Sequence, residues 1–345
     1  MAYTTINKST DYFNTKLYTG NGGTQSITGV GFKPDFTWFK NRSETFDHAF
    51  YDIVRGAYWT IQSNTTSAQT ANDGLTAWTS DGFNIGNVNN TNKNGNNICS
   101  WNWLAGGSQG SSNTDGTINT TYTSVNTTAG FSISQYTGTG SNATVGHGLG
   151  AVPKMIIVKR TNASDVWRVY HGSIGATKHL VLNTTAGEAS GSNVWNDTEP
   201  TSSVFSISTD SAVNASGATY IAYCFAEKTG YCKIGNYTGN GLTDGTFVYT
   251  GFRPSWIMLK RASGDGYEWL IVDNKRDTHN VTTNGLAPNT TAAESGSSYN
   301  SLDILSNGFK PRNNETRINN GNGNILYMAF GQSLVGTNNV PCTAR

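Results

Sequence analysis

Short apolar runs separated by polar turns follow one another along the whole chain, and no long segment has apolar residues at the helical period. Segments such as 131–136 alternate apolar and polar positions, as a half-buried strand does. Runs of a second kind have apolar residues at both odd and even positions: 36–39, 155–158 and 256–259. Such runs are typical of strands buried on both faces. Asp-Gly and Asn-Gly pairs between the runs predict tight turns. The pattern therefore predicts an all-β chain of short antiparallel strands.

The same order of motifs returns three times. A Tyr-Thr-Gly turn at 18–22 recurs at 136–140 and 237–241. After each turn come a proline-led apolar run ending in basic residues, an Asn-Thr-Thr triplet and a closing aromatic strand. The triplets begin at Asn64, Asn183 and Asn289, and the closing strands end at Trp103, Phe225 and Phe330. The repeat is of roughly 100 residues, which is the size of a domain rather than of a solenoid unit.

We therefore predict three tandem antiparallel β-sandwich domains of jelly-roll or lectin-like type. The predicted boundaries are an N-terminal arm at 1–10, unit 1 at 11–107, a linker at 108–128, unit 2 at 129–229, unit 3 at 230–334 and a C-terminal tail at 335–345. Within the linker, residues 118–125 alternate enough to form an added strand instead.

Two tryptophans on the fully apolar runs are predicted to occupy equivalent core positions. Trp38 and Trp256 follow the recurrent proline, and Ile156 or Ile157 is the expected counterpart in unit 2. Because each lies on a run that is apolar at both parities, all of them are expected to be buried.

Composition favours strands over helices. The chain has 40 Gly among its 345 residues, and only 13% of its residues are charged. Each Gly costs a helix about 1 kcal/mol, whereas Asn, Ser and Thr favour turns. The 23 basic and 22 acidic residues give a net charge of +1. Without a concentrated basic face, we expect no nucleic-acid partner.

The chain shows no sign of export, membrane insertion or disulfide bonding. Its first six residues lack the basic and apolar segments of a signal peptide. No apolar run approaches the roughly 20 residues that span a bilayer. The four cysteines (Cys99, Cys224, Cys232 and Cys342) form no CxxC motif. We predict free thiols in a protein made in a reducing cytoplasm.

No catalytic or metal-binding motif is recognisable. The five histidines have neither HExxH nor Cys/His zinc spacing, so we expect no metal, no cofactor and no catalytic residue. The carboxylates considered for a glycosidase pair are Asp47, Asp52, Glu188, Glu199, Glu227, Asp273 and Glu294. Asp52 with Arg55 resembles Asp273 with Arg276, and for both we predict a structural ion pair that braces a loop.

Aromatic residues in variable segments are the candidate binding residues. Trp59, Trp78, Trp195 and Tyr299 lie in stretches rich in Asn, Ser, Thr and Gly that differ between the units. Loops held by a rigid scaffold often carry function. An aromatic face flanked by Asn and Asp can stack on a sugar and bind its hydroxyl groups. The alternative is that these side chains close the edges of the sandwiches.

Several motifs resemble a family of structural proteins of unknown function from marine tailed bacteriophages, especially cyanophages and pelagiphages. The matching segments are 1–6 with 18–22, 137–140 with 145–150, 221–227 and 343–345. The resemblance covers essentially the whole chain and implies membership of the virion. It also implies kinship with tail-fibre or lectin-like sandwich proteins, and it carries over no catalytic residues.

The function expected from repeats and resemblance together is non-enzymatic. The first hypothesis is a tail-fibre or surface adhesin that binds host-surface glycan, because linked weak sites gain in avidity. The alternative is a capsid or tail decoration protein that binds only other virion proteins, with arm 1–10 pairing with a neighbour. A hydrolase ranks third. We expect a virion location after synthesis in the host cytoplasm, other virion proteins as partners, and a homo-oligomer such as a trimer.

Overall fold

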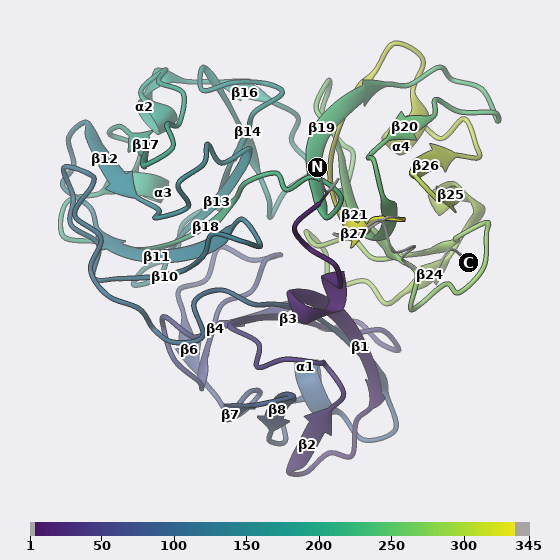
Figure 1. Cartoon of the computed structure of the whole chain (residues 1–345), viewed down its shortest axis with the longest axis horizontal. Helices are drawn as coiled ribbons and strands as arrows, with labels where there is room; N and C mark the ends of the chain where they lie inside the picture. The colour runs from purple at the N-terminus through teal and green to yellow at the C-terminus, as the bar shows by residue number, and fades with distance from the viewer. Residues whose placement is uncertain (1–3, 335–345) are drawn as a thin grey trace.

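The computed structural model describes residues 4–334, apart from the side chain of Tyr299. The predicted tail at 335–345 lies outside the described residues, as do residues 1–3. Strand accounts for 40% of the residues and helix for 6%, so the predicted all-β class is confirmed. Three β-rich lobes surround a common centre, with unit 1 in purple and blue, unit 2 in teal and unit 3 in green and yellow (Figure 1).

Unit 1 has a main sheet in the order β1-β9-β3-β4 and a smaller sheet in the order β2-β8-β7. Its elements are η1 Ser9–Asp11, β1 Phe13–Thr19, β2 Gln25–Thr28, β3 Phe36–Asn41, β4 Ala49–Asp52, β5 Trp59–Thr60, β6 Thr70–Ala71, β7 Ala77–Thr79, β8 Gly82–Ile85, α1 Asn89–Asn92 and β9 Asn97–Trp103. All the pairs are antiparallel, and the opening strand β1 lies beside the closing strand β9.

Unit 2 repeats this plan with a longer main sheet, β10-β11-β18-β13-β14-β15-β16, and a two-stranded sheet, β12-β17. Its elements are β10 Tyr122–Asn126, β11 Phe131–Thr137, β12 Ala143–Gly146, β13 Met155–Arg160, β14 Arg168–His171, β15 Lys178–Val181, β16 Ala189–Ser190, α2 Ser192–Trp195, β17 Val204–Ile207, α3 Ser211–Asn214 and β18 Thr219–Phe225. Strand β10 pairs with β11, so the segment expected as a linker contributes an added strand close to the predicted position.

Unit 3 has a main sheet in the order β19-β27-β21-β22 and a smaller sheet in the order β20-β26-β25. Its elements are β19 Cys232–Thr238, β20 Val248–Tyr249, β21 Arg253–Arg261, β22 Leu270–Asp273, β23 Asn284–Gly285, β24 Ser295–Gly296, η2 Ser298–Asn300, β25 Leu302–Leu305, β26 Gly308–Pro311, α4 Thr316–Asn319 and β27 Asn324–Gln332. The two layers in each unit agree with the predicted β-sandwiches.

The Tyr-Thr-Gly turns are held by a buried asparagine at the end of a short helix. In unit 1, the Oδ1 atom of Asn92 accepts a hydrogen bond from the backbone N–H of Asn21, and its carbonyl accepts from Gly22. Asn214 holds the turn of unit 2 in the same way, and Asn319 holds that of unit 3. The turn recurs because this packing recurs, which gives it a structural role.

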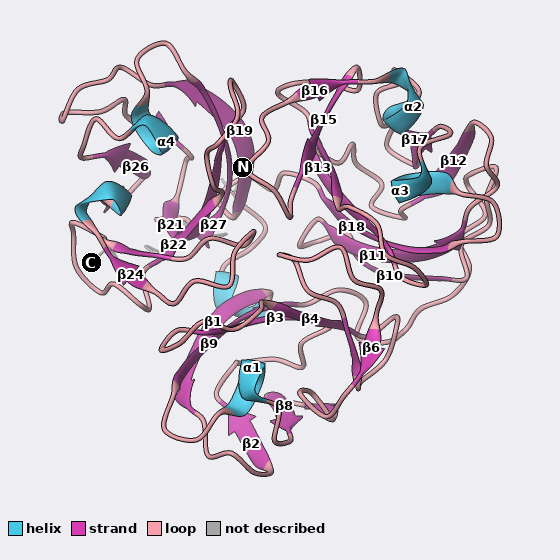
Figure 2. Ribbon diagram, turned by 180° about the vertical axis from the view of Figure 1, so that it is seen from behind, coloured by secondary structure: helices cyan, strands magenta, loops and turns pink. Residues whose placement is uncertain are grey.

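Both faces of each main sheet are buried. One face packs on the smaller sheet of its own unit, which gives each unit a separate core. The opposite faces of all three main sheets meet in one shared central cluster, which includes Trp38, Phe131 and Trp256. Figure 2 shows from behind how the sheets surround this centre. The double burial explains why the runs after the prolines have apolar residues at both odd and even positions.

The predicted burial of Trp38 and Trp256 is confirmed, but their predicted equivalence is wrong. Trp256 pairs with the last residue of the closing aromatic run, Phe330, whereas Trp38 pairs with Trp101, two residues before the end of its own closing strand. The register makes Ile157 the unit 2 counterpart of Trp38. Both tryptophans still reach the central cluster, because positions two apart on a strand share a face. Their ring centroids lie 6.4 Å apart.

Each unit is joined to the next by the same backbone contact, in cyclic order. The N–H of Gln69 in unit 1 donates to Thr161 of unit 2, and the N–H of Glu188 in unit 2 donates to Ala262 of unit 3. The N–H of Glu294 in unit 3 then donates to the carbonyl of Arg42 in unit 1, which closes the ring. Three tandem units thus form a closed pseudo-threefold ring.

Three buried lysines reinforce these junctions. Lys40 donates to the carbonyl of Thr291 at 2.9 Å, Lys159 to Thr66 at 3.0 Å and Lys260 to Thr185 at 3.0 Å. Each acceptor is the last residue of an Asn-Thr-Thr triplet in a neighbouring unit. The recurrent basic residues and the recurrent triplets are therefore two halves of one junction. Burial lowers the pKa of each of the three ammonium groups to about 8.

The described part of the N-terminal arm packs against its own chain. Ile6 is 1% exposed and belongs to the central cluster. The N–H of Ser9 donates to Oε1 of Gln332 at 2.7 Å, and the amide of Gln332 donates to the carbonyl of Asn7. These contacts fasten the N-terminal arm to the last strand of unit 3.

Candidate functional site

The two Asp–Arg pairs form the predicted ion pairs, and both pairs are buried. Nε of Arg55 lies 2.6 Å from Oδ2 of Asp52, and the same distance separates Arg276 from Asp273. Each carboxylate also accepts a hydrogen bond from another unit: Asp52 from the hydroxyl of Tyr223, and Asp273 from an indole N–H. These groups therefore brace loops and unit junctions.

The remaining glycosidase candidates also bind neighbouring side chains or backbone. Glu294 bridges Arg42 and Arg276 at the junction of units 1 and 3, and Glu199 accepts from the hydroxyl of Tyr170. Asp47 accepts from Asn64, and Glu188 and Glu227 form ion pairs with lysines. None of the seven lines the cavity described below.

The two candidate tryptophans of unit 1 differ in exposure. Trp59 lies on β5 and is 40% exposed, next to Tyr58, which is 49% exposed. Trp78 lies on β7, is half-buried and packs against the core of unit 1, with its indole N–H 3.4 Å from Oγ1 of Thr37. Trp59 is thus the one of the pair that offers a ring to solvent.

The other two candidates, Trp195 and Tyr299, lie in units 2 and 3 and not beside the tryptophans of unit 1. Trp195 ends α2 in unit 2, is 1% exposed and packs edge-on against Tyr170. This burial agrees with the edge-closing alternative, because a ring covered in this way has no free face for a ligand. Tyr299 lies in η2 of unit 3, and its side chain lies outside the described part of the structure. The four predicted residues therefore come from three different units and form no common site.

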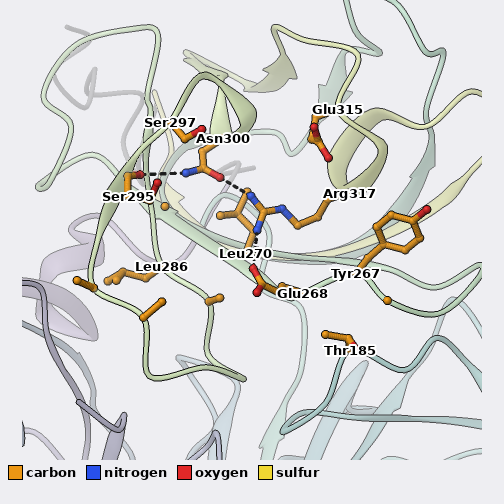
Figure 3. A pocket seen from close by; sticks show the side chains of 15 residues that line it. Thr185, Tyr267, Glu268, Leu270, Leu286, Ser295, Ser297, Asn300, Glu315 and Arg317 are labelled. Carbon is orange, nitrogen blue, oxygen red and sulfur yellow. Dashed lines mark hydrogen bonds and ion pairs between the residues drawn. The ribbon is translucent and has the colours of Figure 1, made fainter. Parts of the chain in front are cut away.

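A cavity of about 550 Å³ opens in unit 3 beside its junction with unit 2. Loop residues before β22, between β23 and β24 and before α4 supply most of its wall, and Thr185 reaches it from unit 2 (Figure 3). Its lining residues are Thr185, Gly266, Tyr267, Glu268, Leu270, Gly285, Leu286, Ala287, Ala292, Ala293, Ser295, Ser297, Asn300, Glu315 and Arg317. The volume is within the usual range of ligand pockets.

A connected polar group lies in this cavity. The guanidinium of Arg317 donates to Oε2 of Glu268 at 3.2 Å and to Oδ1 of Asn300 at 2.5 Å. The amide of Asn300, which is 3% exposed, donates in turn to the carbonyl of Ser295 at 3.1 Å. Burial lowers the pKa of Arg317, and the nearby carboxylates of Glu268 and Glu315 oppose that shift.

The repeats indicate which part of this group the fold requires. The short helices α1, α3 and α4 each end in the buried asparagine that holds the Tyr-Thr-Gly turn. Two positions before that asparagine, unit 3 has Arg317, whereas unit 1 has Asn90 and unit 2 has Ala212. The fold therefore forms without an arginine at this position, and the charge in the cavity belongs to unit 3 alone.

The cavity can hold a neutral polar ligand. Arg317 offers fixed donors, Glu268 offers acceptors, and the hydroxyl groups of Ser295 and Ser297 can do either. Tyr267 adds a half-buried ring whose plane is already contacted by the guanidinium of Arg261, with 4.1 Å from Cζ to the centroid. Sequence reasoning singled out none of these residues. The ion-paired partners Glu268 and Arg317 are 49 positions apart and belong to no recurrent motif.

Metal-binding clusters, disulfide bonds and membrane-spanning helices are not found among the described residues. Within residues 4–334, no group of three or more His, Cys, Asp or Glu side chains could hold a metal ion. Cys99, Cys224 and Cys232 are buried free thiols, as predicted, whereas Cys342 lies outside the described residues. Among the described helices, none has the length and hydrophobicity needed to cross a membrane.

Residues 8–333 match the model of a family described as "Domain of unknown function (DUF7483)". Because this match spans nearly the whole chain, the protein belongs to that family. The matched region contains all three units, so the closed ring as a whole corresponds to the family's domain. No curated protein matches the chain.

Proposed function

We propose that this protein is a non-enzymatic structural component of a phage particle that binds host-surface glycan. The glycan-binding part of this proposal rests on the unit 3 cavity, where Arg317, Glu268 and Asn300 form one polar network. The resemblance of segments such as 137–150 and 221–227 to marine phage structural proteins supports the virion half.

The chemistry of the cavity favours a sugar over a charged ligand. Arg317 is paired with Glu268, and Glu315 adds a further carboxylate, so the cavity offers no uncompensated cation to an anionic ligand. Paired donors and acceptors suit hydroxyl groups, each of which both donates and accepts. Buried polar groups of this kind select strongly for ligands that satisfy them.

Multivalent binding then arises from copies of the chain rather than from its three repeats. Arg317 has no counterpart in units 1 and 2, so each chain has one cavity of this kind in our proposal. Avidity requires several chains held together on a particle or in a homo-oligomer such as a trimer. This replaces the expectation of one weak site per unit.

The decoration hypothesis is the other reading to be tested. It needs a surface that binds other virion proteins, and arm 1–10 was the segment expected to supply it. From Thr4 onward this arm packs against its own chain, and Ile6 is buried in the central cluster. That packing favours a different role for the arm.

The proposal is tested by glycan-array binding of the intact chain, with Glu268→Gln as the site variant. Glu268→Gln should weaken binding at least tenfold, since Arg317 loses its counter-charge and one carboxylate oxygen that accepts hydrogen bonds becomes an amide group that donates them. The matched control is Glu44→Gln, which changes the exposed Glu44–Lys93 pair of unit 1. Equal binding by both variants, or no glycan binding at all, would contradict the proposal. Immunogold labelling of purified particles tests the virion location.

A further inference from the structure

We infer a second glycan-binding surface on the smaller sheet of unit 3, β20-β26-β25. The rings of Phe247 and Tyr249 form it, and we call it the aromatic face. Phe247 is 45% exposed and Tyr249 is 59% exposed, whereas Val248 between them is buried. Alternate positions on a strand share a face and lie about 7 Å apart. Phe247, just before β20, and Tyr249, on β20, therefore present their rings on the same solvent-facing side.

The neighbouring strand holds this arrangement in place. Tyr249 lies opposite Gly308 on β26, and Val248 lies opposite Phe309 in the core of unit 3. The ring of Phe247 lies over Gly308, where a Cβ atom would come within 3.1 Å of its Cε2. A side chain at position 308 would first meet the carbonyl oxygen of Val248, 2.1 Å from the added Cβ, so the close pairing of β20 with β26 requires the glycine, and the ring of Phe247 covers it.

The other units show that the sandwich does not need these rings. Val248, Ile27 and Val145 all pair with a buried phenylalanine on the neighbouring strand, so they are equivalent positions. The residues on either side are Ser26 and Thr28 in unit 1 and Thr144 and Gly146 in unit 2. Exposing two aromatic rings gains the fold nothing, so their presence in unit 3 alone points to binding.

A charge-balanced network lies along the same sheet. Asp244 binds Lys310 at 2.7 Å and Arg312 at 2.8 Å, and Arg312 also binds Asp303 at 3.2 Å. Two cations and two anions compensate one another, so the surface offers donors and acceptors without net charge. This chemistry complements a neutral sugar, whose C–H face stacks on an aromatic ring while its hydroxyl groups bind the ions at its edge.

A sugar chain fits better than a peptide strand. Strand β20 is an edge strand, since the sheet order is β20-β26-β25, but it contains only two residues. An added strand gains affinity from a row of main-chain hydrogen bonds, and so short an edge supplies few of them. The aromatic face instead offers side chains, in a geometry suited to successive rings of a polysaccharide.

This inference rests on the proposed function for the class of ligand, but it concerns different residues. The test is affinity electrophoresis of the intact chain in gels containing neutral mannan, galactan or glucan, with alginate as the acidic comparison. The double variant Phe247→Ala/Tyr249→Ala should bind the retarding neutral polysaccharide at least tenfold more weakly. Phe247→Tyr and Tyr249→Phe keep the rings and should bind as the original chain does. Val152→Ala, another exposed apolar residue, is the matched control.

The outcomes separate this inference from the proposed function. Loss of retardation in the double variant, with unchanged binding by Glu268→Gln, supports the aromatic face and contradicts the proposal that the cavity binds glycan. Unchanged retardation in the double variant, with loss in Glu268→Gln, overturns the aromatic face alone. Retardation of the original chain by alginate only also overturns it. Self-association of the original chain, measured by sedimentation and abolished in the double variant, would also overturn the inference, because the rings would then bind a second copy of the chain.

Discussion

The indole N–H of Trp101 donates a hydrogen bond of 2.9 Å to Oδ2 of Asp273, and this bond joins unit 1 to unit 3. Its counterpart between units 1 and 2 is the bond from Tyr223 to Asp52. At the third position, Nε2 of His171 in unit 2 lies 3.3 Å from the carbonyl of Tyr327 in unit 3. A polar contact from the closing strand of one unit to the strand end of a neighbouring unit thus recurs at all three junctions, with different chemical groups.

Asp273→Ala should destabilise the chain by about 3–5 kcal/mol, since it leaves the buried guanidinium of Arg276 without its main counter-charge. Arg276 retains a contact with Glu294 at 2.7 Å, which limits the loss. Chemical denaturation measures the free energy of unfolding. Asp11→Ala, which breaks the exposed pair with Lys8, is the control and should cost about 0–1 kcal/mol. Similar losses in both variants would show that the buried pair is unimportant.

Trp256→Ala should cost about 3–5 kcal/mol through the cavity that it leaves in the central cluster. The ring of Trp256 lies 5.6 Å from that of Trp103 in unit 1 and 5.9 Å from that of Phe330 in its own unit. The loss should therefore affect all three units together. Trp59→Ala, at an exposed tryptophan, should cost less than about 1 kcal/mol. A Trp256→Ala variant as stable as Trp59→Ala would refute the central packing.

The whole chain should unfold in one transition, and residues 129–229 expressed alone should not fold cooperatively. An isolated unit 2 would expose the face of its main sheet that contributes Phe131, Ile157 and Tyr223 to the central cluster. Differential scanning calorimetry of the intact chain and near-ultraviolet circular dichroism of the fragment check this. A fragment with a sharp transition of its own would show that the units are independent domains.

The junction lysines should contribute a rise in the free energy of unfolding between pH 8 and pH 10, against an opposite contribution from the buried thiols, whose pKa values burial raises. Burial lowers the pKa of Lys159 from 10.5 to about 8, so in this range the unfolded chain binds more protons than the folded chain. Stability increases with pH wherever the unfolded state binds more protons. Lys159→Met should reduce this slope, whereas Lys8→Met, at an exposed lysine, should not. Equal slopes in both variants would contradict the shifted pKa.

We expect the protein not to hydrolyse the glycans that we propose as its ligands. Glu268 and Glu315 both line the cavity, and glycosidases use two carboxylates, so the absence of cleavage needs a direct test. Glu268 already forms an ion pair with the guanidinium of Arg317, at 3.2 Å. Reducing-end assays on bound oligosaccharides measure cleavage. Activity that disappears in both Glu268→Gln and Glu315→Gln would assign the protein to the hydrolases.

The sequence determined the features that depend on local pattern. Alternation and doubly apolar runs predicted the strands, and the recurrent turns predicted three sandwich units. The pairs Asp52–Arg55 and Asp273–Arg276 could be predicted because their members are three residues apart. The burial of Trp38 also followed from its run, although its exact counterpart in unit 3 did not, because two positions on one face look alike in sequence.

Only the tertiary structure decided how the units close and where a ligand can enter. Lys40 and Thr291 are 251 positions apart, so their recurrence gave no sign that they meet. The cavity likewise joins Glu268 and Arg317, which share no motif. Its place depends on how loops of units 2 and 3 pack. Burial on both faces of a sheet can be read from a run of apolar residues, but the identity of the partner on each face cannot, because apolar packing is non-directional.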